Sequence, residues 1–469
     1  MERRVSIMQQ VTLRSAAAQP PRSMWPALAL GLAAFLTNFD VTAVVVALPA
    51  IARELNLGIS GYAWIMDAYS LALTASLLVA GALADRYGRR IAMLCGNAAF
   101  AAASVACGLA WDGPALGVAR ALQGIGAAFV LTGGIALIAA AYPQAALRTR
   151  AFSWLGVISG VAMAIGPTLG GVVTSWLGWR WIFFANIPAC ALVAWGVPRL
   201  VAEAREPSPR PLDYAGTAML SAALFALIEA LLHAGAAPLE RGAGIAAAVL
   251  LLALFAFQQR RRARPIFDPA VFMRPEMVAV AALLAAVSIG YWAVLVYLPL
   301  LLAAAFGWSS DIAGLAMLAA TLPMLVVPPL GARIVVAFGW RRHFAAALAV
   351  MAAGDVALIA ASSTSGAAVT GLAVLGLVAA GFGAALAHPQ LSGAVVALVP
   401  AGQAGMASAL TVVMRQGGFA IGIAVLGALL GAADRADAYA LPIAAAAAAC
   451  VLGSVVAMVL LPAKGGAVR

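Results

Sequence analysis

The sequence predicts an all-α protein that crosses a membrane many times, and three observations support this fold class. Of the 469 residues, 65% are hydrophobic and only 10% are charged, whereas a soluble domain carries about 25% charged residues. Apolar runs recur from Pro26 to Leu461, and no polar block between them is long enough to form a soluble domain. Because one membrane-spanning helix needs roughly 20 apolar residues, the length fits a dozen or more helices joined by short loops.

Charged residues, prolines and glycines divide the chain into fourteen apolar runs. The first run is too long, and too interrupted by Asn38 and Asp40, to be the apolar region of a cleaved signal sequence, so we take it as the first span. The predicted spans are 26–51, 63–84, 91–110, 114–141, 152–177, 181–201, 214–234, 242–258, 277–304, 312–337, 343–362, 367–399, 405–430 and 439–461.

The arginines predict the orientation of these spans. With the N-terminus in the cytoplasm, 21 of the 28 lysine and arginine residues fall on cytoplasmic segments, four on external segments and three within spans. Cytoplasmic loops of membrane proteins are enriched in basic residues, so we expect both termini in the cytoplasm and an even number of spans. The net charge of +11 therefore reflects orientation. No basic stripe with interleaved aromatic residues is present, so we expect no nucleic-acid partner.

A weak internal repeat predicts two halves. Asp40 precedes Ala47-Leu48-Pro49 in the first span by the same distance that Gly290 precedes Tyr297-Leu298-Pro299 in the ninth. Internal repeats of this kind are common in transporters. The predicted organisation is a cytoplasmic tail at 1–25, a six-helix half at 26–201, an inserted helix pair with a cytoplasmic loop at 202–276, a six-helix half at 277–461 and a cytoplasmic tail at 462–469.

Several kinds of chemistry have no signal in the sequence. The four cysteines fall inside apolar runs and the three histidines are scattered, so we predict neither a disulfide framework nor a metal site. No phosphate-binding loop is present, so ATP is not the expected energy source. Because no nucleophile has a neighbouring base, we expect a protein that is not an enzyme and needs no cofactor.

The few charged residues predicted inside spans are the candidate functional groups. Asp40 lies near the middle of the first span, where a carboxyl can hold a proton or be ionised beside a cation. Competition between a proton and a cationic substrate for this carboxylate would couple their movements, and the alternative is a structural hydrogen bond. Arg120 in the fourth span needs a carboxylate, a carbonyl or water as its partner, and its alternative is a structural ion pair. Function and a merely structural or interfacial place are both open for three further acids, Asp67, Glu229 and Asp355.

Several motifs occur in order along the chain. They are the loop Gly81-Ala-Leu-Ala-Asp85-Arg86-Tyr-Gly88-Arg89-Arg90, the run Arg120-Ala-Leu-Gln123-Gly124-Ile-Gly126 in the fourth span, Gly166-Pro167-Thr-Leu-Gly170-Gly171 in the fifth, Asp40 ahead of Ala47-Leu48-Pro49 in the first, and Trp179-Arg180-Trp181-Ile-Phe-Phe-Ala-Asn186-Ile-Pro188. With these motifs the chain resembles the major facilitator superfamily, in its 14-spanner drug:proton antiporter branch. Trp64-Ile-Met-Asp67-Ala-Tyr69 is most similar to the quaternary-ammonium and multidrug exporters of that branch.

The resemblance implies a fold of two pseudo-symmetric six-helix bundles plus two inserted helices, in a monomer within the lipid bilayer of the bacterial cytoplasmic (inner) membrane. It implies proton-coupled efflux of lipophilic small molecules, of cationic character, by alternating access between the halves. The alternative on the same fold is a proton-coupled exporter or importer of a neutral or anionic metabolite or antibiotic, with Asp40 used only for proton coupling.

The resemblance also assigns roles to residues. It implies a cytoplasmic gating loop, in which Asp85 faces a helix N-terminus such as that of the thirteenth span, and a small-residue face on the fifth span that meets the C-terminal half. The gating loop comprises Gly81, Asp85, Arg86, Gly88, Arg89 and Arg90, and the small-residue face comprises Gly166, Pro167, Gly170 and Gly171. We expect Gln123, Gly124 and Arg415 to join helices, and Phe39, Tyr69 and Tyr291 to line the substrate cavity.

Overall fold

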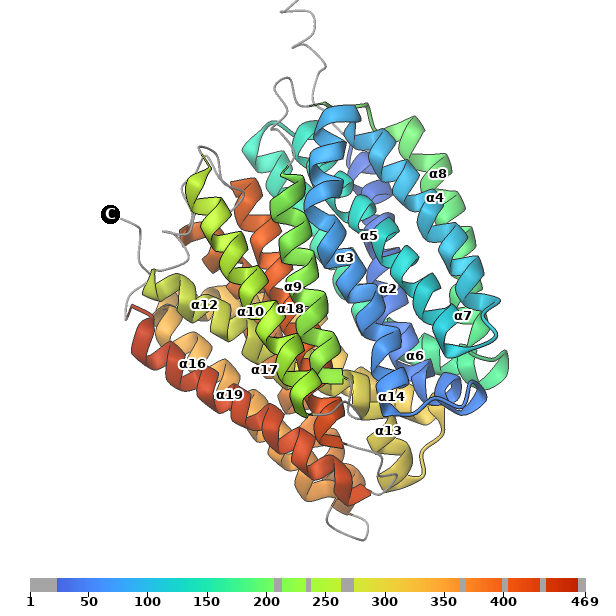
Figure 1. Ribbon diagram of the computed structural model, residues 1–469, viewed down its shortest axis with the longest axis vertical. Helices are drawn as coiled ribbons and strands as arrows, with labels where there is room; N and C mark the ends of the chain where they lie inside the picture. The colour runs from blue at the N-terminus through green and yellow to red at the C-terminus, as the bar shows by residue number, and fades with distance from the viewer. Residues whose placement is uncertain are drawn as a thin grey trace, which may run out of the picture.

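The computed structural model describes residues 23–205, 213–232, 238–262, 274–362, 368–398, 404–430 and 436–462, and the account below is confined to them. Helices make up nearly all of these residues, and no strand occurs among them (Figure 1). This is expected for a chain that crosses a bilayer. The hydrocarbon region offers no water to the backbone, and a helix satisfies its backbone N–H and C=O groups internally.

The N-terminal half contains seven helical segments. Gly88 separates the second from the third by adopting a φ of 124°, which favours glycine. Asp112 begins the fourth by accepting a hydrogen bond from the backbone N–H of Ala115 at 2.7 Å. The segments are α2 (Trp25–Glu54), α3 (Ile59–Tyr87), α4 (Arg89–Gly108), α5 (Gly113–Ala141), α6 (Ala145–Trp176), α7 (Arg180–Phe184) and α8 (Asn186–Leu200).

Two helices stand between the halves, α9 (Tyr214–Leu232) and α10 (Pro238–Arg261), and Figure 1 shows them side by side in front of α18. Asp213, which is 6% exposed, joins the start of α9 to the end of α10. It accepts a hydrogen bond from the N–H of Gly216 at 2.8 Å and pairs with Arg262 at 3.0 Å. Burial alone would raise the pKa of this carboxyl, but hydrogen bonds from Gly216, Gln259 and Gln258 and the charge of Arg262 lower it overall.

The C-terminal half repeats the bundle. Gly339, with a φ of 79°, breaks the long helix α16 at the position that corresponds to Gly88 in the sequence repeat. The elements are α12 (Pro275–Val287), the π-helix η1 (Ser288–Ala293), α13 (Val294–Phe306), α14 (Ser310–Thr321), α15 (Pro323–Val326), α16 (Pro328–Ser362), α17 (Ala368–Leu398), α18 (Ala404–Leu430), the short 3-10 helix η3 (Ala436–Tyr439) and α19 (Ala440–Leu460).

The π-helix η1 coincides with one extra residue in the second half. Pro26 and Pro49 bracket most of α2, and Pro275 and Pro299 bracket the equivalent stretch of α12, η1 and α13, which is one residue longer. A π-helical turn accommodates a residue inserted into an α-helix, and such turns occur frequently at functional sites.

Close approach of helices follows the same pattern in both halves. A Cβ on Gly126 would collide with the backbone of Gly96 and Phe100, and a Cβ on Gly383 would collide with the backbone of Ala347. Small residues permit such approach in membrane proteins, where packing and hydrogen bonds hold helices together.

Eleven of the described helices are long and apolar enough to cross a membrane, and the bent helix α3 makes twelve. The fourteen spans expected from the sequence are not reached by this criterion, because α9 offers only a short apolar stretch and the tenth predicted span is divided among α14, α15 and the first part of α16.

Candidate functional site

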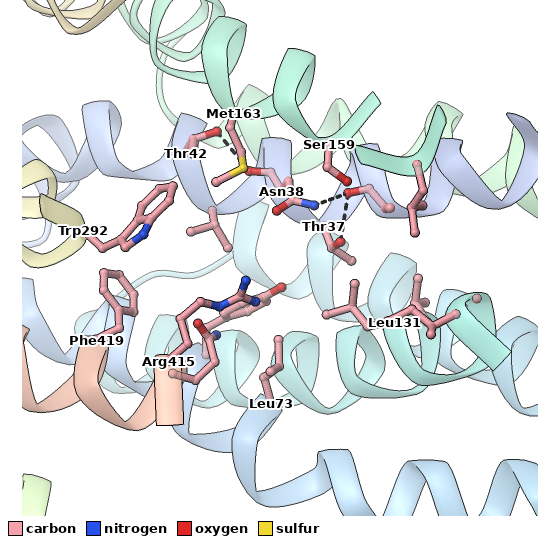
Figure 2. Close-up of a pocket in the computed structure, with 18 of the residues that line it drawn as sticks. Thr37, Asn38, Thr42, Leu73, Leu131, Ser159, Met163, Trp292, Arg415 and Phe419 are labelled. Carbon is pink, nitrogen blue, oxygen red and sulfur yellow. Dashed lines mark hydrogen bonds between the residues drawn. The ribbon is translucent and has the colours of Figure 1, made fainter. Parts of the chain in front are cut away.

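A cavity of about 290 Å³ lies between the two halves (Figure 2). One wall comes from α2, α3, α5 and α6, and the other from η1, α17 and α18. Polar side chains on the N-terminal wall include Thr37, Asn38 and Ser159. Tyr69, which the sequence predicted to line the cavity, also lies in this wall. An apolar cavity with a few converging polar groups is the usual form of a small-molecule site.

The opposite wall carries Trp292, His388, Arg415 and Gln416. The indole N–H of Trp292 donates to Nδ1 of His388 at 2.9 Å, and a guanidinium nitrogen of Arg415 lies 3.3 Å from Nε2 of the same histidine. The sequence assigned Arg415 to helix packing, and its backbone carbonyl does accept a hydrogen bond from Ser288 at 3.1 Å. Its side chain faces the cavity, as Figure 2 shows.

The halves close on each other at the end of the molecule where α2 finishes and α3 begins. The rings of Tyr62 and Tyr297 stack with centroids 5.7 Å apart, and the Tyr62 hydroxyl donates to the carbonyl of Val296 at 2.6 Å. On the α6 side, the Thr168 hydroxyl donates to the carbonyl of Gly314 at 3.1 Å. We call these contacts the seam. It bounds the cavity at one end.

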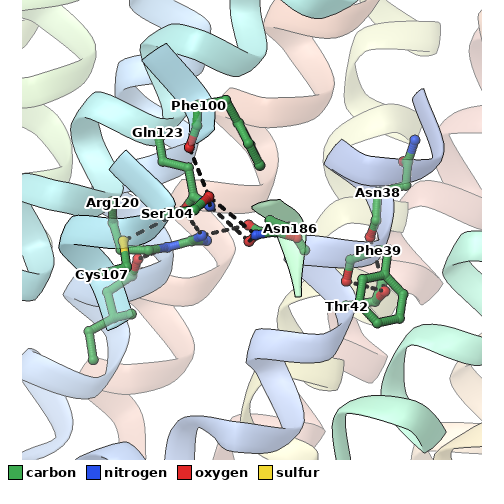
Figure 3. A network of polar contacts seen from close by, with 11 residues as sticks. Asn38, Phe39, Thr42, Phe100, Ser104, Cys107, Arg120, Gln123 and Asn186 are labelled. Atoms are coloured by element: carbon green, nitrogen blue, oxygen red, sulfur yellow. Dashed lines mark hydrogen bonds and ion pairs between the residues drawn. The ribbon is translucent and has the colours of Figure 1, made fainter. Parts of the chain in front are cut away.

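A buried polar network lies inside the N-terminal half (Figure 3). Asp40 pairs with Arg120 at 2.6 Å and accepts hydrogen bonds from Gln123 at 2.9 Å and Asn186 at 2.7 Å. Arg120 also donates to Gln123 at 2.6 Å, and Ser104 accepts from Gln123 at 2.9 Å. Asp40 and Arg120 are both fully buried. Three donors, one of them charged, satisfy the hydrogen-bonding capacity of this buried carboxyl group.

This network lies behind the cavity wall. Neither Asp40 nor Arg120 is among the residues that line the cavity, but the guanidinium of Arg120 lies 4.4 Å from the centroid of the Tyr69 ring. Tyr69 therefore contacts the cavity and also packs on the buried charge. The sequence identified Asp40, Arg120 and Gln123 as candidates but not Asn186 and Ser104. Asn186 lies within the motif Trp179–Pro188 named above, without a role having been assigned to it.

Asp67 is a buried acid with a different environment. It is fully buried on α3, and neither carboxyl oxygen has a hydrogen-bond partner in the described part of the chain. It lies near Tyr297 of the C-terminal half, at the seam. An unpaired carboxylate would be very unfavourable in such a place, so the neutral, proton-bearing form is the stable one.

Asp355 on α16 is likewise fully buried, with no partner for either carboxyl oxygen among the described residues. Asp355 follows Gly339 by the same number of residues as Ser104 follows Gly88, so Asp355 and Ser104 occupy equivalent positions in the two halves. A Cβ on Gly124 would strike the carbonyl oxygen of Tyr69, and a Cβ on Gly381 would strike that of Ala320, so these glycines also correspond.

This correspondence places Leu377 at the position of Arg120 and Ala380 at that of Gln123. Asp355 therefore occupies the counterpart of the N-terminal network without the basic and amide groups that would stabilise its charge. The neutral acid is again the favoured form.

The comparison with known families decides the class of protein. Residues 30–286 match the family described as Major Facilitator Superfamily. The chain belongs to this superfamily. It is therefore a multi-pass membrane transporter of small molecules rather than an enzyme.

Named relatives in the superfamily are resistance proteins. The Multidrug resistance protein Stp of Mycobacterium tuberculosis (strain CDC 1551 / Oshkosh) is 33% identical over 408 residues, which cover 86% of this chain and 75% of that protein. The Tetracenomycin C resistance and export protein of Streptomyces glaucescens is 31% identical over 412 residues, covering 87% and 76%. Among solved structures, a D-xylose-proton symporter shares the fold with a TM-score of 0.67 at 16% identity, covering 93% of this chain and 97% of that one.

The superfamily loop between α3 and α4 is held by one acid of its own motif, Asp85, and by one acid of a later segment, Glu203. Asp85 pairs with Arg89 at 2.9 Å. Glu203, which the sequence did not single out, accepts hydrogen bonds from the N–H groups of Arg90 at 2.9 Å and Ile91 at 3.1 Å. These carboxylate contacts cap the N-terminus of α4. The N-terminus of the thirteenth span, where the sequence expected Asp85 to face, adjoins residues 399–403, outside the described residues.

The small-residue motif on α6 serves two interfaces. A Cβ on Gly166 would collide with Thr42, and one on Gly170 with the backbone of Ala43, so both glycines pack against α2 of the same half. A Cβ on Gly171 would collide with the carbonyl oxygen of Ser310 on α14. The carbonyl of Pro167 faces Gly314 of α14 in the same way. The face therefore meets the C-terminal half through Pro167 and Gly171.

Three remaining predicted residues lie elsewhere. Phe39 stacks on Phe35 with centroids 5.7 Å apart, and Tyr291 is buried with its hydroxyl donating to the carbonyl of Ala320 at 2.8 Å. Neither is among the residues that line the cavity. The backbone of Glu229 belongs to α9, and its side chain lies outside the described part of the structure.

Proposed function

We propose that this transporter exports lipophilic drugs or antibiotics in exchange for protons, by alternating access to the cavity between its halves. The names of the relatives, which specify multidrug resistance and tetracenomycin C resistance and export, support drug efflux. The seam supports alternation, since it closes one end of the cavity through one pair of stacked rings, hydrogen bonds and the packing of α6 on α14, contacts that can separate.

We further infer fourteen spans, with both termini in the bacterial cytoplasm. The helices support this number when α7 joins α8, when α12, η1 and α13 are taken as one span, when α16 is divided at Gly339, and when α14, α15 and the part of α16 before Gly339 together make one span. In this orientation the seam lies on the external side and the cavity is loaded from the cytoplasm. The loop that contains Gly81, Asp85 and Arg86 is then the cytoplasmic gate.

The observation that carries proton coupling is the position of Asp67. It is a buried, unpaired carboxyl at a seam that must open when the cavity faces outward. A neutral acid is stable while the seam is closed, and water that enters the opened seam stabilises the ionised form. One cycle therefore moves the proton of Asp67 between two environments. Asp355 is a second proton-bearing acid, and Glu229 remains a candidate on α9.

Asp40 has a different part in this scheme. Its carboxyl group is held by three donors, one of which is the guanidinium of Arg120. Because Arg120 packs on Tyr69 and Tyr69 lines the cavity, a bound substrate can displace this pair and alter its protonation. Substrate binding and proton movement are thereby linked through one aromatic ring.

The cavity wall bears on the two substrate classes that the sequence left open. Arg415 is the charged residue of the wall, and none of the described lining residues is acidic. A site with a positive charge and no carboxylate disfavours cations. We therefore propose a neutral or anionic lipophilic substrate in preference to a cationic one.

Proton release from vesicles tests the proposal. Purified protein is placed in proteoliposomes with a pH-sensitive dye, and tetracenomycin C is added as the first probe. We expect probe-dependent proton movement in the wild type and in the control Glu276→Gln, at the start of α12 away from the cavity, and none in Asp67→Asn. Proton movement at the wild-type rate in Asp67→Asn would contradict the role of Asp67. Persistent exchange in Asp40→Asn would leave Asp40 with a structural role only.

A further inference from the structure

The cavity contains two hydrogen-bond donors that face each other. An indole N–H can only donate, so the 2.9 Å bond from Trp292 makes Nδ1 of His388 the acceptor. A neutral imidazole has one acceptor and one donor nitrogen, and its hydrogen therefore sits on Nε2. Nε2 lies 3.3 Å from a guanidinium nitrogen of Arg415, which also can only donate. The two groups cannot bond each other.

The charge of Arg415 is also uncompensated. No ion pair with a carboxylate is found for Arg415 among the described residues, and none of the described residues that line the cavity is acidic. An arginine remains charged in proteins, so at membrane depth it requires an electronegative partner. In the N-terminal half the equivalent demand of Arg120 is met by Asp40. Among the described residues of the cavity, no carboxylate meets the demand of Arg415, so this charge is available to a bound molecule.

We propose that the transported molecule supplies this partner: an anionic oxygen, such as a carboxylate or a phenolate, that binds between Arg415 and Nε2 of His388. This inference rests on the proposed function, since it names the substrate class of the same cavity. A single acceptor oxygen satisfies both donors and neutralises the guanidinium. Bonds from charged donors to such oxygens are shorter and stronger than those between neutral groups.

The surroundings indicate an aromatic body for the same molecule. Trp292 and Phe419 lie together on one side of Arg415 on the C-terminal wall, as Figure 2 shows, and Tyr69 lies in the opposite wall. Aromatic rings pack on one another by offset or edge-to-face contact. The cavity thus fits a planar aromatic acid whose acidic oxygen points to the C-terminal half and whose ring reaches Tyr69.

A matched set of fluorescent probes tests the charge preference. Anthracene-9-carboxylate and 9-(aminomethyl)anthracene share one ring system and carry opposite charges. Their equilibrium binding to the full-length protein in nanodiscs is measured without a pH gradient. We expect the carboxylate to bind at least about ten-fold more tightly than the amine, because hydrogen bonds to charged groups contribute this much. Tighter binding of the amine would overturn the inference.

Three variants locate the preference. Arg415→Gln should lower the affinity for anthracene-9-carboxylate by about ten-fold and leave the amine unaffected or better bound. Arg333→Gln is the matched control, because it removes one positive charge from an exposed position outside the cavity. Unchanged binding of the carboxylate in Arg415→Gln, or an equal loss in Arg333→Gln, would contradict the site.

Trp292→Phe keeps the inference testable should Arg415→Gln fail to fold. Without the indole N–H, the His388 hydrogen can move to Nδ1 and Nε2 can accept from Arg415, so the two groups satisfy each other. We expect the carboxylate preference to fall by about three-fold or more, and an undiminished preference would refute the assignment of the His388 hydrogen. Loss of pH-driven transport with the carboxylate preference intact would defeat the proposed function alone. Cation preference with pH-driven transport intact would defeat this inference alone.

Discussion

The buried pair of Asp40 and Arg120 permits a quantitative test of the structure. The perturbation is Arg120→Leu, which places in the N-terminal half the residue found at the equivalent position 377 of the C-terminal half. Asp40 would remain fully buried with hydrogen bonds from Gln123 and Asn186 but no balancing charge. Removal of one partner from a buried ion pair costs about 3–5 kcal/mol, so we expect a loss of this size in the free energy of unfolding.

The double variant Asp40→Asn/Arg120→Leu separates the pair from its surroundings. With both charges gone, the penalty of an isolated buried carboxylate disappears, and the double variant should be about 2 kcal/mol more stable than Arg120→Leu alone. Unfolding is followed in mixed micelles of a mild detergent and dodecyl sulfate, by tryptophan fluorescence. If the double variant shows the sum of the two single losses, with a coupling below about 0.5 kcal/mol, the ion pair does not stabilise the folded transporter.

Three further predictions concern the seam and the ends of helices. Gly171→Leu should collide with Ser310 and keep the seam open, which should raise external labelling of a Thr168→Cys reporter. The control Gly156→Leu, which has open space around it on the same helix, should not raise this labelling. Equal labelling of the two variants would contradict the contact between Gly171 and Ser310. Glu203→Gln should weaken the cap of α4 and lower the free energy of unfolding by about 1 kcal/mol, and no change would show that the cap is unimportant. The pKa of Asp213 lies below the usual 3.8, so its stabilising effect is present above pH 3.8 and is lost as the pH falls through and below that value. Asp213→Asn should therefore flatten the acid limb of a stability–pH curve, and an unchanged limb would count against this carboxyl.

Much of the fold follows from the sequence because the bilayer leaves few alternatives. Apolar length predicted the helices, and the breaks at Gly88 and Gly339 follow from backbone angles that glycine adopts readily. The π-helix η1 could not be predicted, because a single inserted residue leaves the apolar pattern of α12 and α13 intact. The division of the tenth predicted span reflects three closely spaced prolines, Pro323, Pro328 and Pro329.

The candidate site was predicted only in part. Charge at membrane depth identified Asp40 and Arg120, since such residues need partners wherever they lie. The partners of these residues depend on how each helix is rotated about its own axis, which the sequence does not show. Asn186 and Ser104 were therefore recognised only from the positions of α4, α5 and α8 in the structure. Arg415 was identified but given to helix packing, because a sequence does not reveal which face of α18 meets the cavity. His388 was passed over as an isolated histidine, and its importance arises from two neighbours distant in the chain.

The extra residue at η1 has an evolutionary consequence. Two halves that descend from one ancestral bundle would be expected to present similar surfaces to the space between them. A π-helical turn accommodates an inserted residue locally, and here Trp292 occurs in the inserted turn and reaches His388. One codon can thus change which side chains a duplicated helix offers to a substrate, without disturbing the packing on either side. Lengthening or shortening this turn is a simple route by which such transporters acquire new specificities while the surrounding architecture is inherited unchanged.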